Sequence, residues 1–183
     1  ATALVLVLGI WAQELPGGQT QSIDLVYALP YVFWEYSLFR DQFYGYDQWM
    51  SAVFAGLYEL DMVAEHSFVP LLARDAIVEV NGTDFYSETY AMRVNVTLRE
   101  GLRFSNGDPL TAQDVKFTLQ MHFSPEVRSR RYEWYTDLFG GNESIVVVDD
   151  THVTFNFRKT YPFWQGAIAF RVLPEEVFKP AYD

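Results

Sequence analysis

The clearest alternation of hydrophobic and polar positions lies between Tyr90 and Leu98. Every second residue of this segment is apolar or aromatic: Tyr90, Met92, Val94, Val96 and Leu98. Polar residues, or the small Ala91, occupy the positions between them. Side chains of a β-strand point alternately to its two faces, so this period of two predicts a strand with one buried face.

The residues that follow predict a turn and then a helix. Asn106-Gly107 is a turn dipeptide, because both residues tolerate a positive φ. Thr111 occupies the position of a helix N-cap, and Asp114 can complete a capping box and favour the positive end of the helix dipole. Apolar residues at helical spacing then predict a helix that runs to about His122.

Weaker patterns elsewhere in the sequence predict both strands and helices. They predict a buried parallel strand at Leu4 to Ile10, a helix from Asp47 to about Gly56, a strand at Ala76 to Val80, a short helix within Pro125 to Gly141, and a hairpin that turns at Asp149-Asp150. Together these elements predict a mixed α/β fold with antiparallel hairpins in its middle.

The segment from Leu98 to Val115 also carries a longer motif with fixed offsets. It consists of Leu98, Arg99, Gly101, Phe104, Gly107, Pro109, Leu110, Thr111, Ala112, Asp114 and Val115. This order of residues resembles the family 5 extracellular solute-binding proteins, which serve peptide, nickel and some oligosaccharide ABC importers. Supporting resemblances at 55–59, 69–73, 145–157, 161–163 and 173–178 extend the match over about residues 50–180.

The resemblance implies a domain organisation. Members of this family close around a ligand with two lobes and are several hundred residues long, whereas this chain has 183 residues. We therefore expect the N-terminal portion of lobe I of a periplasmic-binding-protein type II-like fold. Residues 1–35 and 161–183 would be parts of the ligand-facing α/β lobe, and residues 36–160 the inserted subdomain of the family. The second lobe would belong to a C-terminal part of the same protein that is missing from this chain.

The resemblance also suggests ligand contacts. In the family, the loop after the first strand approaches the cleft, and here it holds Trp11, Gln13 and Glu14. A later segment that returns towards the cleft holds Trp164 and Arg171, and a nearby arginine binds carboxylates in nickel-binding relatives. The chain is shortened around this arginine, so ordinary surface and core roles remain open for all five residues.

The composition of the chain limits the classes of partner and the cellular locations that are expected. The formal net charge is −11, which argues against a nucleic-acid partner because phosphate binding needs a basic surface. The chain has no cysteine, so it can form neither a disulfide nor a thiolate metal site. Three of the five asparagines, Asn81, Asn95 and Asn142, lie in N-glycosylation sequons, although small-number coincidence explains them equally well. With the resemblance, these features predict an extracellular, periplasmic or cell-surface protein, with or without a membrane anchor.

Signatures of catalysis are weak. The histidines are far apart and lack metal-binding spacing: His66, His122 and His152. His122, at the end of the predicted helix, is expected to be a capping or surface residue. Asp149-Asp150 is better explained by a hairpin turn than by a metal site, and Asp114 by helix capping than by catalysis. We therefore expect no enzyme activity, no cofactor and no metal.

These observations predict the substrate-binding component of an ABC importer. It would bind a peptide, an oligosaccharide or a related small solute between two lobes and deliver it to the membrane permease. A structural or adhesive cell-surface module that reuses the same fold is the alternative, favoured by the short chain, the sequons and the aromatic residues. A hydrolase is a third hypothesis, which no residue pattern supports.

Overall fold

The computed structural model describes residues 5–11, 22–28, 53–61, 67–81 and 90–181. The chain divides into two compact units, Ala1–Ser37 and Leu38–Asp183. In the described residues, no helix is both long enough and apolar enough to cross a membrane.

The first unit contains a two-stranded antiparallel sheet. Strand β1 (Val5–Trp11) pairs with β2 (Ser22–Ala28), so that Val5 lies opposite Ala28 and Trp11 opposite Ser22. The strand predicted at Leu4 to Ile10 is therefore present, but its expected parallel pairing is wrong. A parallel pair needs a crossover of roughly a dozen or more residues, whereas an antiparallel pair can be joined by a short connection such as residues 12–21.

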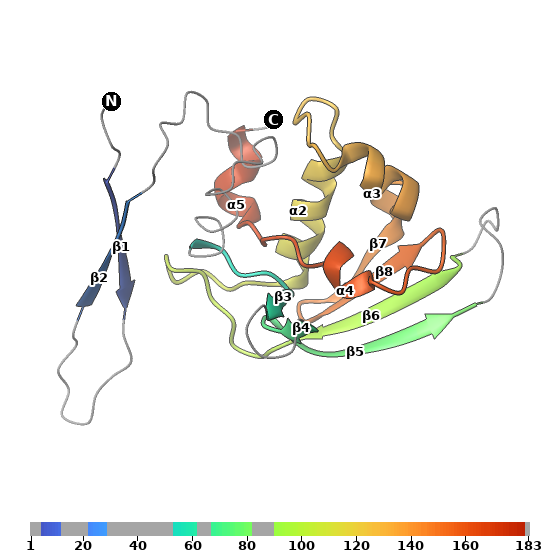
Figure 1. The fold of residues 1–183 in the computed structure, drawn as a ribbon, viewed down its shortest axis with the longest axis horizontal. Coiled ribbons are helices and arrows are strands. Elements are labelled where there is room, and N and C mark those ends of the chain that lie inside the picture. Colours follow the sequence, from blue (N-terminus) through green and yellow to red (C-terminus); the bar gives the residue numbers. More distant parts are fainter. Residues whose placement is uncertain (1–4, 12–21, 29–52, 62–66, 82–89, 182–183) are drawn as a thin grey trace. The chain divides into compact units, whose positions relative to one another are not determined.

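The second unit is built on a four-stranded antiparallel sheet with the order β5-β6-β8-β7 (Figure 1). The strands are β5 (Ala73–Val80), β6 (Met92–Leu98), β7 (Ile145–Asp149) and β8 (His152–Phe157). Along β6 the odd and even positions alternate between half-buried and buried, as the sequence predicts. The hairpin predicted at Asp149-Asp150 is confirmed as the β7–β8 connection.

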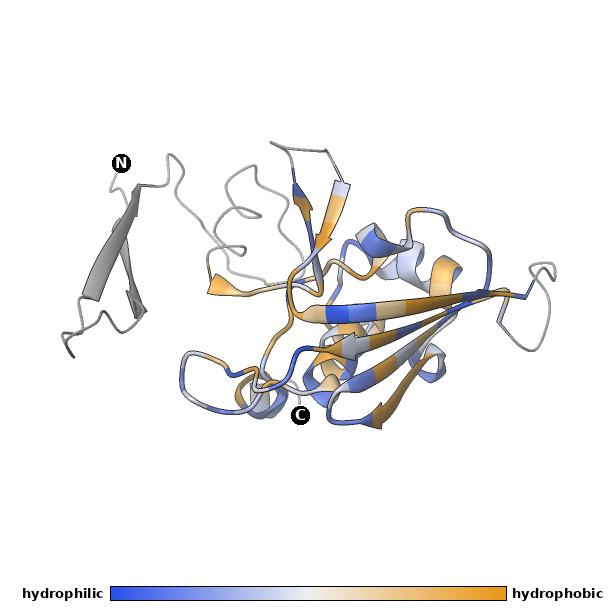
Figure 2. Ribbon diagram, turned by 90° about the horizontal axis from the view of Figure 1, so that it is seen from below, coloured by the Kyte–Doolittle hydropathy of each residue, from blue (hydrophilic) through white to orange (hydrophobic). Residues whose placement is uncertain are grey.

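Two helices cover one face of this sheet (Figure 1). They are α2 (Ala112–Phe123) and α3 (Tyr132–Phe139), which match the predicted helix after Thr111 and the short helix within Pro125 to Gly141. Figure 2 views the sheet from its open side, with the helices behind strands whose hydrophilic and hydrophobic residues alternate. The core between the layers includes Met92, Val94, Leu98, Leu119, Tyr135, Leu138, Phe155 and Phe157. Burial of each such side chain contributes about 1.5–3 kcal/mol to folding.

A smaller hairpin and two short helices complete the second unit. The hairpin pairs β3 (Tyr58–Asp61) with β4 (Ser67–Pro70). The short helices are α4 (Trp164–Ala167) and α5 (Glu175–Phe178), and the 3-10 turns η1 (Asn142–Ser144) and η2 (Lys179–Ala181) lie beside longer elements. Pro174 precedes α5 as its N-cap.

The helix predicted from Asp47 to about Gly56 lies mostly outside the described residues. Within them, Val53 is helical, but Gly56 forms an antiparallel bridge with Arg171, so the helix ends earlier than predicted. The reason is pairing with a distant segment: Val172 N donates to Ala55 O at 2.9 Å. A Cβ on Gly56 would lie 3.0 Å from the carbonyl oxygen of Phe170, so glycine permits this close approach.

Candidate functional site

Arg171 is the predicted ligand residue whose surroundings are described most fully. Its Nη2 donates to Oε1 of Glu59 at 3.2 Å, which ties the segment after α4 to strand β3. The side chain of Arg171 is 21% exposed and that of Glu59 is 41% exposed. In the part of the chain that the structure describes, Nη1 of Arg171 is buried and has no hydrogen-bond acceptor. A buried charged donor without an acceptor is unfavourable, so Nη1 is an unsatisfied group in this part of the chain.

The sequence patterns do not predict Glu59 as the partner of Arg171. The two residues are 112 positions apart, so no local pattern connects them. The available signal was indirect: Glu59 belongs to the 55–59 segment that supports the family resemblance. Glu59 orients the guanidinium and partly compensates its charge.

Trp164 is a ligand candidate with a packing role. It is the first residue of α4 and is half-buried. Its ring meets that of Tyr58 edge-on, with centroids 5.4 Å apart and an interplanar angle of 86°. Burial, followed by the charge of Asp75, raises the pKa of the Tyr58 hydroxyl. Tyr58 and Glu59 are consecutive strand residues that point to opposite faces, so β3 does not bring Trp164 and Arg171 together.

The three remaining ligand candidates are less well placed. Trp11 is the last residue of β1 and pairs with Ser22 through the backbone. Gln13 and Glu14 lie outside the described residues. These three residues remain predictions.

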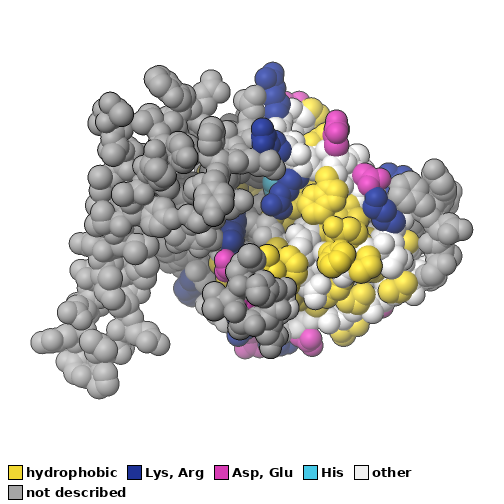
Figure 3. Space-filling view, in the orientation of Figure 1, with side chains coloured by type: hydrophobic (Ala, Val, Ile, Leu, Met, Phe, Trp, Pro, Cys, Tyr) yellow, Lys and Arg dark blue, Asp and Glu magenta, His cyan; other side chains and the backbone are white. Residues whose placement is uncertain are grey.

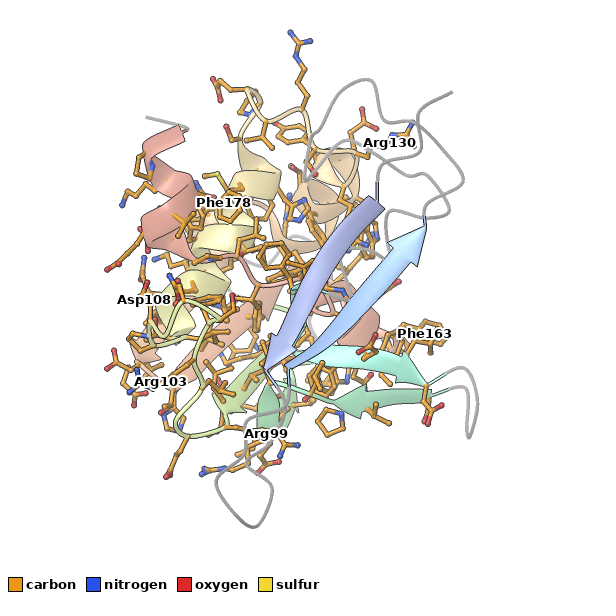
Figure 4. All side chains as sticks on the ribbon, turned by 90° about the vertical axis from the view of Figure 1, so that its left-hand side faces the viewer. Arg99, Arg103, Asp108, Arg130, Phe163 and Phe178 are labelled. Carbon is orange, nitrogen blue, oxygen red and sulfur yellow. The ribbon has the colours of Figure 1, made fainter. Side chains whose placement is uncertain are left out.

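Aromatic residues also form a row at the surface of the second unit. The ring of Tyr161 is 6.4 Å from that of Trp134 and 6.2 Å from that of Phe163, centroid to centroid. Phe163 is 69% exposed and projects from the edge of the unit (Figure 4), and Figure 3 shows hydrophobic side chains gathered on one face. The aromatic content therefore serves both the core and the surface.

Asp114 is a structural residue, as predicted. Its Oδ2 accepts a hydrogen bond from Thr111 N at 2.8 Å, and the Asp114 N–H donates in return to the Thr111 side chain, which completes the capping box. Thr111 Oγ1 also accepts from Gln113 N. Oδ1 of Asp114 also accepts from Glu175 N at 3.0 Å. One carboxylate thus stabilises the start of α2 and the start of α5, and both of its oxygens are occupied.

His122 corrects the sequence-based expectation. It was expected to be a capping or surface residue, but it is buried with 7% exposure. Its Nδ1 lies 2.6 Å from Ser129 Oγ, and its ring packs edge-on against Tyr135. Burial lowers the pKa of His122 to about 3, and the charge of Arg131 acts in the same direction. The residue is therefore a neutral part of the core at physiological pH.

Asp149 stabilises the hairpin turn. Its Oδ1 accepts hydrogen bonds from the backbone N–H groups of Thr151 and His152 at 2.8 and 2.9 Å. The Thr151 N–H, followed by the hydrogen bond with the His152 imidazole at 2.8 Å, lowers the pKa of the Asp149 carboxyl to about 2. Within the described ranges, no group of three or more His, Asp or Glu side chains is arranged to hold a metal ion.

The sequon asparagines occupy different environments. Asn81 and Asn142 are exposed, at the end of β5 and in η1. Asn95 is half-buried in the middle of β6, where Nδ2 donates to Glu79 at 3.1 Å and Oδ1 accepts from Thr154 at 2.8 Å. Glycosylation of Asn95 would disrupt both hydrogen bonds, whereas Asn81 and Asn142 remain candidates.

Solved structures show the same fold. NikZ from Campylobacter jejuni in complex with Ni(L-His) matches 69% of this chain with 24% identity and a TM-score of 0.56. OppA from Listeria monocytogenes bound to peptide matches 77% with 19% identity and a TM-score of 0.62. AppA from Bacillus subtilis in complex with a nonapeptide matches 79% with 18% identity and a TM-score of 0.62. These likenesses establish the mixed α/β, periplasmic-binding-protein type II-like fold.

The matched part is a small portion of those proteins. The chain spans 23% of the NikZ chain, 28% of the OppA chain and 26% of the AppA chain. A comparison with curated proteins gave no significant match.

The sequence itself identifies the family. The family model described as "Bacterial extracellular solute-binding proteins, family 5 Middle" matches residues 68–182, which is more than half of the chain. This range contains the motif from Leu98 to Val115 and the arginine at position 171. The chain therefore belongs to the family 5 bacterial extracellular solute-binding proteins.

Proposed function

We propose that this chain is part of the substrate-binding component of an ABC importer and contributes Arg171 as a ligand for a solute carboxylate. The observation that carries this proposal is the buried Nη1 of Arg171, which has no acceptor in the described residues while Nη2 is held by Glu59. Family membership supports a substrate-binding role without chemistry, in an exported protein. The peptide complexes of OppA and AppA support a solute that carries carboxylates.

The proposed mechanism is binding between two lobes. Residues 1–35 and 161–183 would belong to the ligand-facing lobe, and residues 36–160 to the subdomain that the family attaches to it. The opposing lobe would come from the rest of a longer protein, because this chain spans only about a quarter of the solved structures it matches. A solute that contacts both lobes would shift the population towards a closed state, which the permease would receive.

The test uses the longest natural protein that contains this sequence. Isothermal titration calorimetry with short peptides would compare the natural protein with an Arg171→Gln variant. Loss of a charge-assisted hydrogen bond costs about 1.5–3 kcal/mol, so affinity should fall roughly tenfold or more. A peptide with an amidated C-terminus should bind equally weakly to both proteins if its carboxylate is the group that Arg171 binds.

Arg103→Gln is the matched control. Arg103 is exposed and donates to Gly107 O within the loop before α2 (Figure 4), so the same charge change there should leave affinity unaltered. Peptide binding that survives Arg171→Gln would remove Arg171 from the site while retaining the transport role. A natural protein of only 183 residues would instead favour a structural or adhesive surface module, because the second lobe would be missing.

A further inference from the structure

A concave site lies at one end of the four-stranded sheet. Its volume is about 500 Å³, which is within the range of small-molecule sites. Its walls come from the start of β6, the end of β8 and the Gly140–Ser144 segment after α3. Two of the lining residues, Arg93 and Arg158, carry positive charge, and one, Glu143, carries negative charge. The pocket is therefore locally basic on a chain whose net charge is −11.

Arg93 is held in a defined orientation. Its guanidinium carbon lies 3.7 Å from the centre of the Tyr90 ring, and its Nε donates to Oδ1 of Asn156 at 2.9 Å. In the described part of the chain, these are the partners of the guanidinium, and its two Nη groups have no acceptor. The stacking on Tyr90 and the hydrogen bond from Nε to Asn156 reduce the conformational entropy that Arg93 would lose on binding a ligand. The two Nη groups form the edge that binds planar oxyanions with two hydrogen bonds.

Another part of the pocket lining is a tight glycine turn packed on Arg158. Gly140 and Gly141 have φ values of 93° and 150°, and a Cβ on Gly140 would lie 2.8 Å from Arg158 Cδ. The Arg158 backbone is also fixed, because its N–H donates to Leu138 O at 2.9 Å. The C-terminal end of α3 would disfavour an anion, but Gly140 N–H already caps the Thr136 carbonyl at 2.8 Å.

We propose that this pocket binds an oxyanion, the phosphate or carboxylate group of a small molecule, with Arg93 as its bidentate donor. Arg158 also lines the pocket. The site is separate from Arg171 and does not depend on the proposed transport role. Since the attraction is electrostatic and partly exposed to solvent, affinity falls as ionic strength rises.

The experiment titrates the 183-residue chain with sodium phosphate and, separately, with sodium succinate, against sodium chloride at equal ionic strength. Backbone amide NMR shifts report the location, and the expected shifts centre on Gly140, Gly141 and Ser144. Shifts with phosphate alone identify a phosphate site, and shifts with succinate alone identify a carboxylate site. Either result supports the proposal.

Variants then test the role of Arg93. Arg93→Gln should raise the dissociation constant about tenfold or more. Arg93→Lys, which keeps the charge but loses the planar guanidinium, should raise it less. Arg128→Gln is the matched control, because Arg128 is exposed in the α2–α3 connection, at the other end of α3 from Gly140. Melting temperatures of all variants verify folding. The proposal is overturned if neither anion shifts these amides, or if Arg93→Gln and Arg128→Gln bind the anion equally well.

Discussion

At the scale of single residues, His122 shows that packing decides chemistry. A histidine near the end of a helix is usually solvent-accessible, where it can be protonated. Here the side chain lies between Ser129, Tyr135 and Phe170, and burial holds the imidazole neutral. The consequence concerns stability rather than catalysis, because protonation of a buried histidine opposes folding.

Lowering the pH should therefore destabilise the folded protein over a defined pH range. The pKa of His122 is about 3 in the folded state and 6.5 in its ordinary state, so the unfolded chain binds more protons between these values. The free energy of unfolding should fall as the pH drops below 6.5, by up to about 1.4 kcal/mol per pH unit. Urea denaturation at several pH values between about 4.5 and 7 measures this slope while avoiding the titration of most carboxylates.

His122→Gln is the informative variant. It should be less stable than the natural chain at neutral pH. Its free energy of unfolding should, however, depend less steeply on pH over the same pH range. His152→Gln is the matched control, because His152 is exposed and belongs to the β7–β8 hairpin. An unchanged slope in the His122 variant would show that another group causes the acid sensitivity.

At the scale of elements, one carboxylate connects two helices. Asp114 caps α2 and accepts the first free N–H of α5, and Thr118 reinforces the same junction by accepting from Leu173 N at 2.9 Å. The short helix α5 thus starts at a position set by α2. The link explains why a helix of a single turn, which would be marginal alone, is stable in this protein.

Asp114→Ala should destabilise the second unit by about 1–3 kcal/mol. The estimate combines the loss of a capping interaction with the loss of an acceptor for Glu175 N–H. Gln113→Ala, in the same helical turn but exposed, should change stability by less than about 0.5 kcal/mol. Chemical denaturation of both variants measures the difference, and equal stabilities would contradict the structural role given to Asp114.

At the scale of the whole molecule, the second unit contains the core that the structure describes. The buried cluster between sheet and helices extends from Leu57 to Val172, entirely within the Leu38–Asp183 unit. Its sheet, helices and β3–β4 hairpin have their own hydrogen-bond networks. A unit with its own core is expected to fold by itself.

A chain restricted to residues 38–183 should therefore retain cooperative unfolding. Its melting temperature should stay close to that of the 183-residue chain, since the described core residues are all preserved. Differential scanning calorimetry of the two chains gives the comparison, with far-UV circular dichroism to verify the secondary structure. Loss of a cooperative transition would show that residues 1–37 are required for the fold of the remainder.

Local features could be read from the sequence because their causes are local. The buried face of β6, the capping box at Thr111 and Asp114, and the turn at Asp149 each depend on residues a few positions apart. The motif from Leu98 to Val115 and its neighbours were also sufficient to indicate the family, which the family model confirms.

Tertiary structure alone decided which distant segments meet. Strand β6 lies between β5 and β8, β1 pairs antiparallel with β2, and Arg171 contacts Glu59 across 112 positions. The same holds for Arg93 and Asn156 in the pocket beside β6 and for the burial of His122. The physical reason is that hydrophobic periodicity determines which face of an element is buried, whereas the identity of its partner depends on how all the elements pack together.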